Sequence, residues 1–407
     1  MNIENLHRLF LECSSVSTDT RKIEKDCMFF ALKGANFDAN EFANEALKKG
    51  AKYVVIDNSA YNTDNRTILV DDVLTVLQKL STFHRDYLGL PILALTGSNG
   101  KTTTKELINV VLTKKFETKA TKGNLNNHIG VPLTLLSFNN ETEFGIVEMG
   151  ANHQKEIEFL CAIAKPDFGY ITNFGKAHLE GFGGVEGVIK GKSEMYSYLQ
   201  SNDKTVFVNF DDIIQVEKTS SIKRFTFSQK TSEANVFIQS VSANPFVEIK
   251  FSDIQINSHL IGLYNANNIN AAIAIGRYFG VDDYVIKEAI ESYIPENNRS
   301  QIIKKGNNEI ILDAYNANPS SMAVAIDNFL NLQNDNKVLI IGDMFELGET
   351  SLDEHAKIVS MLKDFSDVRC YFVGKDFFSN KEDLNHFHFY ATFENLSKEL
   401  IHESFSN

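Results

Sequence analysis

Cysteines are few in this sequence, and they form no pattern. The four cysteines stand far apart and include no CxxC pair. Their scarcity argues against a zinc ribbon or a dense disulfide framework, and it fits a reducing cytoplasm. We therefore expect four thiols with a packing role, at Cys13, Cys27, Cys161 and Cys370.

Long hydrophobic runs are missing as well. No apolar stretch approaches the length that a helix needs to cross a bilayer. The N-terminus carries Glu4 and Arg8 and lacks the apolar segment of a signal peptide. These absences predict a cytoplasmic protein without a membrane partner.

Clustered positive charge is a third absence. The net charge is -13 at pH 7, and no long group of Lys and Arg residues occurs. Proteins that bind nucleic acid through its phosphates usually present a basic face, so we expect no nucleic-acid partner. An anionic substrate would have to be held by a local group of cations and backbone N–H groups.

The sequence does have the length for several domains. Its 407 residues, 43% of them hydrophobic, exceed what one ordinary core organises. Strand-like runs alternate with helical patterns, which is typical of α/β proteins. We predict three blocks, with boundaries that fall at 1–88, 89–296 and 297–407.

Each block has its own predicted strands. The first holds runs at 27–34, 51–57 and 67–72. The second alternates strands at 91–95, 143–150, 166–175 and 204–210 with helices, which predicts a parallel sheet, and the weaker run 220–252 suggests an antiparallel excursion. The third repeats the alternation at 308–319, 337–344 and 368–374, which predicts a second parallel sheet.

The strongest local signal is the segment TGSNGKTTT at 96–104. A predicted strand precedes it and a predicted helix follows, so backbone N–H groups should face a phosphate at the positive end of the helix. Lys101 could reach the β- and γ-phosphates, and the Thr102 hydroxyl could bind Mg²⁺. A usual phosphate loop has a further glycine where this chain has Leu95, so the loop is a shorter variant. An ordinary glycine-rich turn is the alternative.

Polar residues close several of the predicted strands. Glu148 ends one run, and His178 follows the next. Because ligands of open α/β sheets bind beyond the carboxyl ends of the strands, both residues could face the phosphates and bind Mg²⁺. Taken alone, each residue of this kind is more often a surface polar group.

The remaining candidates are more ambiguous from chemistry alone. Lys192 lies in a helical pattern, where a lysine is usually solvated. Asp313 and Asn316 follow one strand of the third block, and Asp343 and Glu346 follow another. They could form Asx turns and helix caps, or one wall of a cleft.

Nearly the whole chain carries a resemblance to the Mur ligases. TGSNGKTTTKE is similar to the ATP loop of that family. The other motifs resemble, in order, those of the member that joins D-alanyl-D-alanine to a UDP-muramoyl tripeptide. They lie at 17–42, 123–136, 148–157, 171–184, 190–194, 263–272, 313–322 and 341–349. DAYNANP at 313–319 is the most telling, because a relative that adds a diamino acid would show an Asp-Asn-Pro-Arg core there.

The resemblance implies a fold, two cofactors and two substrates. It implies a small α/β substrate domain, a central ATPase domain with a phosphate loop and a parallel sheet, and a Rossmann-like C-terminal domain. ATP and Mg²⁺ would be the cofactors, and a monomer is expected. A UDP-N-acetylmuramoyl tripeptide would be activated as an acyl phosphate, which the amine of D-alanyl-D-alanine then attacks, as the third domain closes over the second.

Roles also follow from the resemblance, residue by residue. The catalytic set would be Lys101, His178 and Lys192, the last as a carbamate. Mg²⁺ would be bound by Thr102, Glu148, His178 and Lys192. ATP would be bound by Gly97, Ser98, Asn99, Gly100, Lys101, Thr102, Thr103, Asn268, Arg299 and Asp313. The substrates would contact Thr18, Asp19, Thr20, Arg21, Lys33, Asn124, Asn126, Asn127, His128, Tyr315, Asn316 and Asn318.

The sequence departs from the family pattern at one place and leaves three alternatives open. The family usually continues to a last strand with a Lys-Gly-Ser-Arg-Gly stretch, so we expect a third domain without its final strand. The chain could also be another Mur ligase or a folate-polyglutamate ligase, against which DAYNANP argues. A regulatory nucleotide-binding module would not need Glu148, His178 and Lys192 together.

Overall fold

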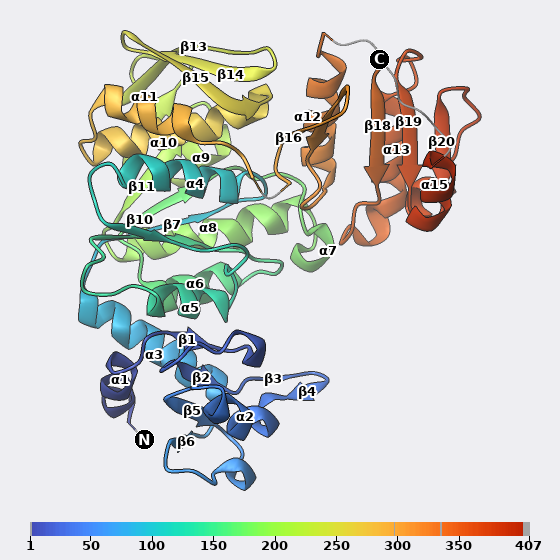
Figure 1. Ribbon diagram of the computed structural model, residues 1–407. Helices are drawn as coiled ribbons and strands as arrows, with labels where there is room; N and C mark the ends of the chain where they lie inside the picture. The colour runs from blue at the N-terminus through green and yellow to red at the C-terminus, as the bar shows by residue number, and fades with distance from the viewer. Residues whose placement is uncertain (1, 297, 334–335, 402–407) are drawn as a thin grey trace.

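The computed structural model describes residues 2–296, 298–333 and 336–401. Three sheet-containing domains follow one another along the chain, with the first below the central domain and the third beside it (Figure 1). The predicted three-domain α/β organisation is thereby confirmed. The boundaries at 88/89 and 296/297 stay predictions, and residues 297 and 402–407 lie outside the described residues.

The first domain is a parallel sheet covered on both faces. Its strand order is β1-β2-β5-β6. Phe29 and Phe30 alternate between two cores, because successive side chains of a strand point to opposite faces. The strands are β1 (Val16–Ser17), β2 (Met28–Phe30), β5 (Tyr53–Ile56) and β6 (Thr67–Leu69), with the hairpin β3 (Lys33–Gly34) and β4 (Phe37–Asp38). The helices are α1 (Ile3–Leu11), α2 (Ala43–Lys48) and α3 (Val73–Leu88), with short 3-10 turns η1 (Thr20–Lys22), η2 (Ala39–Phe42) and η3 (Ser59–Tyr61).

The central domain is built on a sheet of nine strands in the order β15-β14-β13-β12-β11-β10-β7-β9-β8. Strand β7 reads ILALT without a polar interruption because helices cover both faces. Ile92 packs on the side of α6 and α8, and Leu93 packs on the side of α4 and α10. The strands are β7 (Ile92–Thr96), β8 (Thr118–Ala120), β9 (Phe144–Glu148), β10 (Phe168–Ile171), β11 (Thr205–Asn209), β12 (Lys223–Ser228), β13 (Val236–Ala243), β14 (Phe246–Phe251) and β15 (Ile254–Ile261). The helices are α4 (Lys101–Leu112), α5 (Gly130–Leu136), α6 (Glu156–Ala164), α7 (Leu179–Phe182), α8 (Val185–Ser201), α9 (Ile213–Lys218), α10 (Ala266–Tyr278) and α11 (Asp283–Ser292), with η4 (Leu263–Asn265).

The predicted antiparallel excursion is partly wrong. Strand β12 pairs in parallel with both β11 and β13, so it extends the parallel sheet. Only β13, β14 and β15 form the antiparallel part. Strand β12 runs parallel to β11 because helix α9 connects the two strands. The residues of β12 themselves do not indicate whether it pairs in parallel or antiparallel.

The third domain combines a hairpin and a small parallel sheet. Strands β18, β19 and β20 pair in parallel, as predicted for 337–344 and 368–374. The prediction that the strand at 308–312 joins this sheet is wrong, because β17 pairs antiparallel with β16 in a separate two-stranded ribbon. The elements are β16 (Gln301–Lys305), β17 (Asn308–Leu312), α12 (Pro319–Leu330), β18 (Val338–Gly342), η5 (Gly348–Thr350), α13 (Ser351–Met361), β19 (Arg369–Val373), α14 (Lys375–Ser379), β20 (Phe387–Tyr390) and α15 (Phe393–Leu400).

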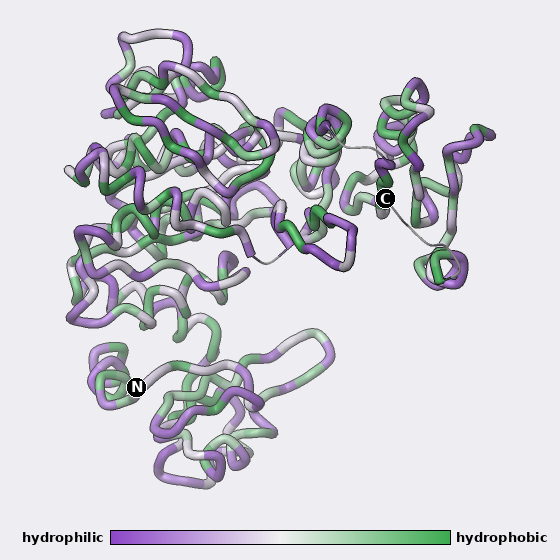
Figure 2. The backbone as a smooth tube through the Cα atoms, turned by 45° about the horizontal axis from the view of Figure 1, so that its top comes forward, coloured by the Kyte–Doolittle hydropathy of each residue, from purple (hydrophilic) through white to green (hydrophobic). Residues whose placement is uncertain are grey.

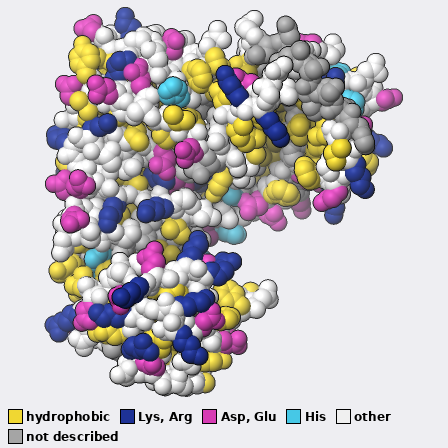
Figure 3. All heavy atoms as spheres, viewed as in Figure 1, with side chains coloured by type: hydrophobic (Ala, Val, Ile, Leu, Met, Phe, Trp, Pro, Cys, Tyr) yellow, Lys and Arg dark blue, Asp and Glu magenta, His cyan; other side chains and the backbone are white. Residues whose placement is uncertain are grey.

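Three features of the described residues bear on the cysteines, the hydrophobic runs and the surface charge. The four cysteines are free; three of them are buried, and Cys13 is half-buried. No helix of residues 2–401 that the structure describes is long and apolar enough to cross a membrane, and hydrophobic and hydrophilic stretches alternate along the chain in Figure 2. On the face shown in Figure 3, Lys and Arg side chains are interspersed with Asp and Glu.

Candidate active site

The phosphate loop joins β7 to α4 and needs both of its glycines. Gly97 has φ +147°, and a Cβ there would lie 1.9 Å from the Thr172 hydroxyl oxygen. Gly100 has φ +77°, and its Cβ would lie 2.6 Å from Oδ1 of Asn268. Side chains at either position would be strained and would clash. Leu95 is a fully buried strand residue, so the loop starts only at Gly97 and needs no glycine at position 95.

Lys101 opens helix α4, whose first N–H groups face the loop. Its Nζ donates a hydrogen bond of 2.8 Å to the Gly97 carbonyl, so the ammonium group arches back over the loop. Burial lowers the pKa of the Lys101 ammonium against the attraction of the Glu148 carboxylate. A cation and a helix N-terminus at one turn form a site for phosphate.

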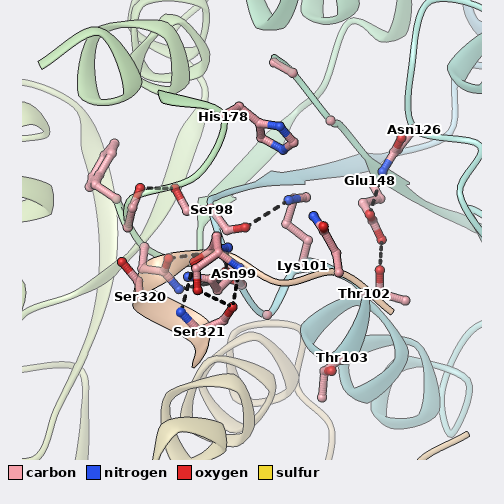
Figure 4. A pocket seen from close by; sticks show the side chains of 18 of the residues that line it. Ser98, Asn99, Lys101, Thr102, Thr103, Asn126, Glu148, His178, Ser320 and Ser321 are labelled. Atoms are coloured by element: carbon pink, nitrogen blue, oxygen red, sulfur yellow. Dashed lines mark hydrogen bonds between the residues drawn. The ribbon is translucent and has the colours of Figure 1, made fainter. Parts of the chain in front are cut away.

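Glu148 is the buried carboxylate of the site. It closes strand β9 with 1% of its surface exposed. Thr102 Oγ1 donates to one carboxylate oxygen at 2.9 Å, and Asn126 Nδ2 donates to the other at 2.9 Å (Figure 4). A hydroxyl and a carboxylate beside a phosphate loop are the oxygen ligands that suit Mg²⁺, which keeps waters and phosphate oxygens as further ligands. Groups of three or more His, Cys, Asp or Glu residues suited to a metal are absent from the described residues.

His178 takes a partner from another domain. It precedes α7 in a left-handed conformation with φ +53°. Its Nδ1 forms a hydrogen bond with Oε2 of Glu346 from the third domain. Burial lowers the pKa of His178, the Glu346 carboxylate opposes this, and the positive charges of Lys101 and Lys192 add to it. The role of His178 as a metal ligand stays a prediction.

Lys192 is buried within α8 rather than solvated, with 1% of its surface exposed. Its Nζ lies 5.2 Å from the centre of the Phe182 ring. Burial first, and then the Lys101 charge, lower the pKa of Lys192 well below its usual value, against the attraction of Glu156. A lowered pKa favours the neutral amine, which is the form that reacts with carbon dioxide when a carbamate forms.

One cavity of about 1170 Å³ joins these groups to the third domain. It lies beyond the carboxyl ends of β7 and β9, where open α/β sheets bind ligands. Gly97, Lys192 and Asn124 do not line it. The predicted residues that line it are Ser98, Asn99, Gly100, Lys101, Thr102, Thr103, Asn126, Asn127, His128, Glu148, His178, Asn268, Arg299, Asp313, Tyr315, Asn316 and Asn318.

The third domain contributes a wall of stacked and capping groups. The Arg299 guanidinium lies 3.8 Å from the centre of the Tyr315 ring. Burial raises the pKa of Asp313, opposed by a backbone hydrogen bond and the Arg299 charge. Asn318 caps helix α12 and donates from Nδ2 to Oδ1 of Asn99 at 2.6 Å, which connects this wall directly to the phosphate loop.

Two predicted wall residues have other partners. Asp343 is not part of the cavity wall, because its carboxylate accepts hydrogen bonds from the backbone N–H groups of Asp376 and Phe377 at the start of α14. It therefore acts as a helix cap, the alternative that its strand-end position left open. Glu346 also lies outside the cavity lining and contacts His178.

Asn268 lines the cavity, yet its amide already has protein partners. Its Oδ1 accepts from Thr104 Oγ1 at 3.0 Å, and its Nδ2 donates to Asn265 Oδ1 at 2.8 Å. It packs against Gly100 and so supports the phosphate loop from behind. Its contact with adenine stays a prediction.

The first-domain residues do not reach this cavity. Arg21 forms an exposed ion pair of 2.8 Å with Asp19, and Lys33 pairs with Asp57 at 2.8 Å. Both cations belong to the first domain, and that domain lies below the central domain in Figure 1. The predicted substrate contacts of Thr18, Asp19, Thr20, Arg21 and Lys33 stay predictions.

Sequence reasoning missed two residues that shape the loop. Asn173 accepts from the Asn99 backbone N–H at 3.1 Å and donates to the Asn99 carbonyl at 3.0 Å. Thr172 donates to the same carbonyl at 2.5 Å. The available signal was their position at the end of β10, one strand away from the loop.

Three family descriptions match successive parts of the chain. The Mur ligase family catalytic domain matches residues 12–85, the Mur ligase middle domain matches 95–276, and the Mur ligase glutamate ligase domain matches 298–399. Together they follow the order of the three domains.

Similar proteins and structures agree with these matches. UDP-N-acetylmuramoyl-tripeptide--D-alanyl-D-alanine ligase of Bacillus subtilis is 34% identical over 88% of this chain and 80% of its own length. The enzyme of the same name from Escherichia coli is 32% identical over 89% of this chain and 81% of its own length.

Among solved structures, MurF from Acinetobacter baumannii superposes with a TM-score of 0.87 at 29% identity, covering 98% of this chain and 91% of its own. MurF ligase from Thermotoga maritima in complex with ADP has a TM-score of 0.83 at 25% identity, covering 97% of this chain and 92% of its own. With its phosphate loop, its buried carboxylate and its three matched domains, this chain belongs to the Mur ligase family.

Proposed function

We propose that this chain is an ATP-dependent ligase that joins D-alanyl-D-alanine to the terminal carboxylate of a UDP-N-acetylmuramoyl tripeptide. The product is the pentapeptide precursor of peptidoglycan. The observation that carries the proposal is a shared cavity, which is lined by Lys101 and Glu148 and also by Asn316 and Asn318 of the third domain. The shared name of the similar proteins supplies the choice of substrates.

The first step transfers the γ-phosphoryl group of ATP to the peptide carboxylate. A carboxylate is a poor acceptor for an amine because oxide would have to leave, whereas an acyl phosphate releases phosphate. Lys101 and the N–H groups at the start of α4 neutralise charge on the transferred group. Thr102 and Glu148 would hold Mg²⁺, which would supply further charge neutralisation at the phosphates.

The second step forms the amide. The free amine of D-alanyl-D-alanine attacks the acyl carbon, the bond to the phosphate oxygen breaks, and the amine loses a proton as inorganic phosphate leaves. Tyr315, Asn316 and Asn318 line the cavity from the third domain and offer an aromatic ring and amide partners to a short peptide. Closure of this wall over the loop excludes water, which protects the acyl phosphate from hydrolysis.

The remaining roles extend this scheme to the first domain and to Lys192. The hydroxyls and cations of Thr18 to Arg21 and Lys33 are suited to a diphosphate, with Asn124 and Asn126 to His128 beside the sugar. A Lys192 carbamate would add a hard oxygen ligand next to Lys101. We place the enzyme in the cytoplasm as a monomer, because its free cysteines fit a reducing compartment and its reaction needs ATP.

The decisive experiment is an acceptor screen. Purified protein is given ATP, a UDP-muramoyl precursor and D-alanyl-D-alanine, D-glutamate, lysine or diaminopimelate, and ADP release and product mass are measured. ADP release that requires both the tripeptide precursor and D-alanyl-D-alanine supports the proposal. Product from a single amino acid and a shorter precursor would place the chain at another step of the family, and ATP binding without turnover would indicate a regulatory module.

A further inference from the structure

Lys105 is a buried cation for which the phosphate-loop chemistry has no direct use. It lies one helical turn after Thr102 in α4, with 1% of its side chain exposed. Its Nζ donates to the Thr121 carbonyl at 2.5 Å and pairs with Glu106 Oε1 at 2.7 Å. Burying an ammonium group costs free energy, which the hydrogen bonds of that group must offset. The groups that accept these bonds are therefore the ones that Lys105 holds in place.

Thr121 is the root of the loop that approaches Glu148. It follows the last residue of β8, and its backbone N–H donates to the Ile146 carbonyl of β9 at 2.9 Å. Its hydroxyl oxygen accepts from the Glu148 backbone N–H at 3.0 Å. The Thr121 side chain thus adds one hydrogen bond to the pairing of β8 with β9. Its partner in this bond is the backbone of Glu148.

The same loop returns to Glu148 through Asn126. Asn126 donates to the carboxylate at 2.9 Å, and its own carbonyl accepts from the Gly150 backbone N–H at 2.7 Å. Glu148 is therefore held by its backbone through Thr121 and by its carboxylate through Asn126 and Thr102. Since Thr102 and Lys105 share one helix, Lys105 ties the root of the loop to the helix that carries the hydroxyl partner of Glu148.

We infer that Lys105 is a positioning residue that fixes the distance between Thr102 and the Glu148 carboxylate by anchoring Thr121. This inference rests on the proposed use of ATP with Mg²⁺ at these two oxygen donors. Groups that orient a metal ligand through hydrogen bonds usually change metal affinity by about 10- to 100-fold when removed. Lys105 acts through Thr121 and Asn126 and does not itself line the cavity.

An exposed lysine in the same part of the chain serves as a control. Lys115 follows α4 and donates to the carbonyls of Phe279 and Gly280 at 2.9 and 3.0 Å, away from the cavity. It is a lysine that caps carbonyls as Lys105 does, but without a connection to Glu148. Lys105→Met and Lys115→Met remove the ammonium group at each place and keep a long apolar side chain.

The test measures ADP binding by titration calorimetry, with Mg²⁺ and with EDTA, together with the melting temperature. We expect Lys105→Met to weaken ADP binding in Mg²⁺ by about tenfold and to change binding in EDTA far less. Lys115→Met should bind ADP as the wild type does under both conditions. Lys105→Met with a lower melting temperature but wild-type Mg²⁺ dependence would overturn the inference and leave a structural lysine.

A second variant covers the case in which Lys105→Met does not fold. Thr121→Val keeps the shape and the carbonyl but removes the hydroxyl that accepts from Glu148, so it should lose Mg²⁺-dependent affinity in the same way. Wild-type affinity in Thr121→Val would overturn the inference. Failure of the wild-type chain to bind ADP at all would instead overturn the proposed function.

Discussion

Asn318 in the third domain donates a hydrogen bond of 2.6 Å to the side chain of Asn99 in the phosphate loop. The two residues are 219 positions apart in the sequence. Asn318 also caps α12 through the Ser321 backbone N–H, so one side chain both starts that helix and holds it against the loop. The contact gives the third domain a direct connection to the place where ATP would lie.

Asn318 variants should separate these two tasks. Asn318→Ser keeps a capping hydroxyl but is too short to reach Asn99, so the turnover rate should fall by about tenfold, or 1.4 kcal/mol, with little change in stability. Asn318→Ala removes the cap as well and should lower the free energy of unfolding by about 1 kcal/mol. Steady-state kinetics and urea unfolding measure the two effects. Equal turnover in wild type and Asn318→Ser would show that the contact does not matter for the reaction.

Lys101→Ala should abolish most turnover and leave the fold intact. The ammonium group neutralises charge that grows in the transition state, so its loss should lower the turnover rate by about a hundredfold or more. Lys114→Ala, at an exposed position beyond the end of the same helix, is the control. ADP release and far-UV circular dichroism are the measurements. Near-full activity of Lys101→Ala would contradict the assignment of residues 96–104 as a phosphate loop.

Lys192→Ala should be nearly inactive if the lysine works as a carbamate. Burial and the Lys101 charge lower the pKa of Lys192, which favours the neutral amine that can take up carbon dioxide. A small carboxylate such as acetate should restore part of the activity of Lys192→Ala. Added bicarbonate should raise the activity of the wild type. Lys190→Ala on an exposed face of α8 should behave as the wild type. A fully active Lys192→Ala enzyme would mean that the buried amine has no role in the reaction.

The stability of the fold should fall in acid because of a buried pair of histidines in the first domain, next to the central domain. His7 Nε2 and His84 Nδ1 lie 3.0 Å apart, and His84 Nε2 contacts the Phe138 carbonyl of the central domain. Burial, then the neighbouring His84, lower the pKa of His7 from 6.5 to about 4. The unfolded chain therefore binds a proton at a higher pH than the folded chain does, and stability should fall as the pH drops from 6.5 towards 4.

The expected slope is up to about 1.4 kcal/mol per pH unit for this group. His7→Gln should flatten the dependence of the unfolding free energy on pH in that window, and His259→Gln, at an exposed position of β15, should leave it unchanged. Urea unfolding at a series of pH values gives both slopes. Parallel curves for His7→Gln and the wild type would rule out this histidine as the source.

The sequence by itself determined the parts of the protein that depend on neighbouring residues. The strand, loop and helix around 91–116 follow from ILALT, from two glycines and from Lys101, because steric limits and helix capping act within a few positions. The motifs also placed Glu148 at a strand end beside the loop, where it lies with Thr102. Family membership, the three α/β domains and the phosphate loop were all predictable at this level.

Only the tertiary structure decided which distant groups share a partner. Asp343 had the same strand-end signal as Glu148, yet it caps α14, because that helix starts beside it in the folded domain. Glu346 contacts His178 across 168 positions, and the strand at 308–312 pairs with β16 instead of joining the parallel sheet. These contacts and pairings depend on how whole elements pack against one another. Packing between segments that are far apart in the chain cannot be predicted from the residues adjacent to either segment.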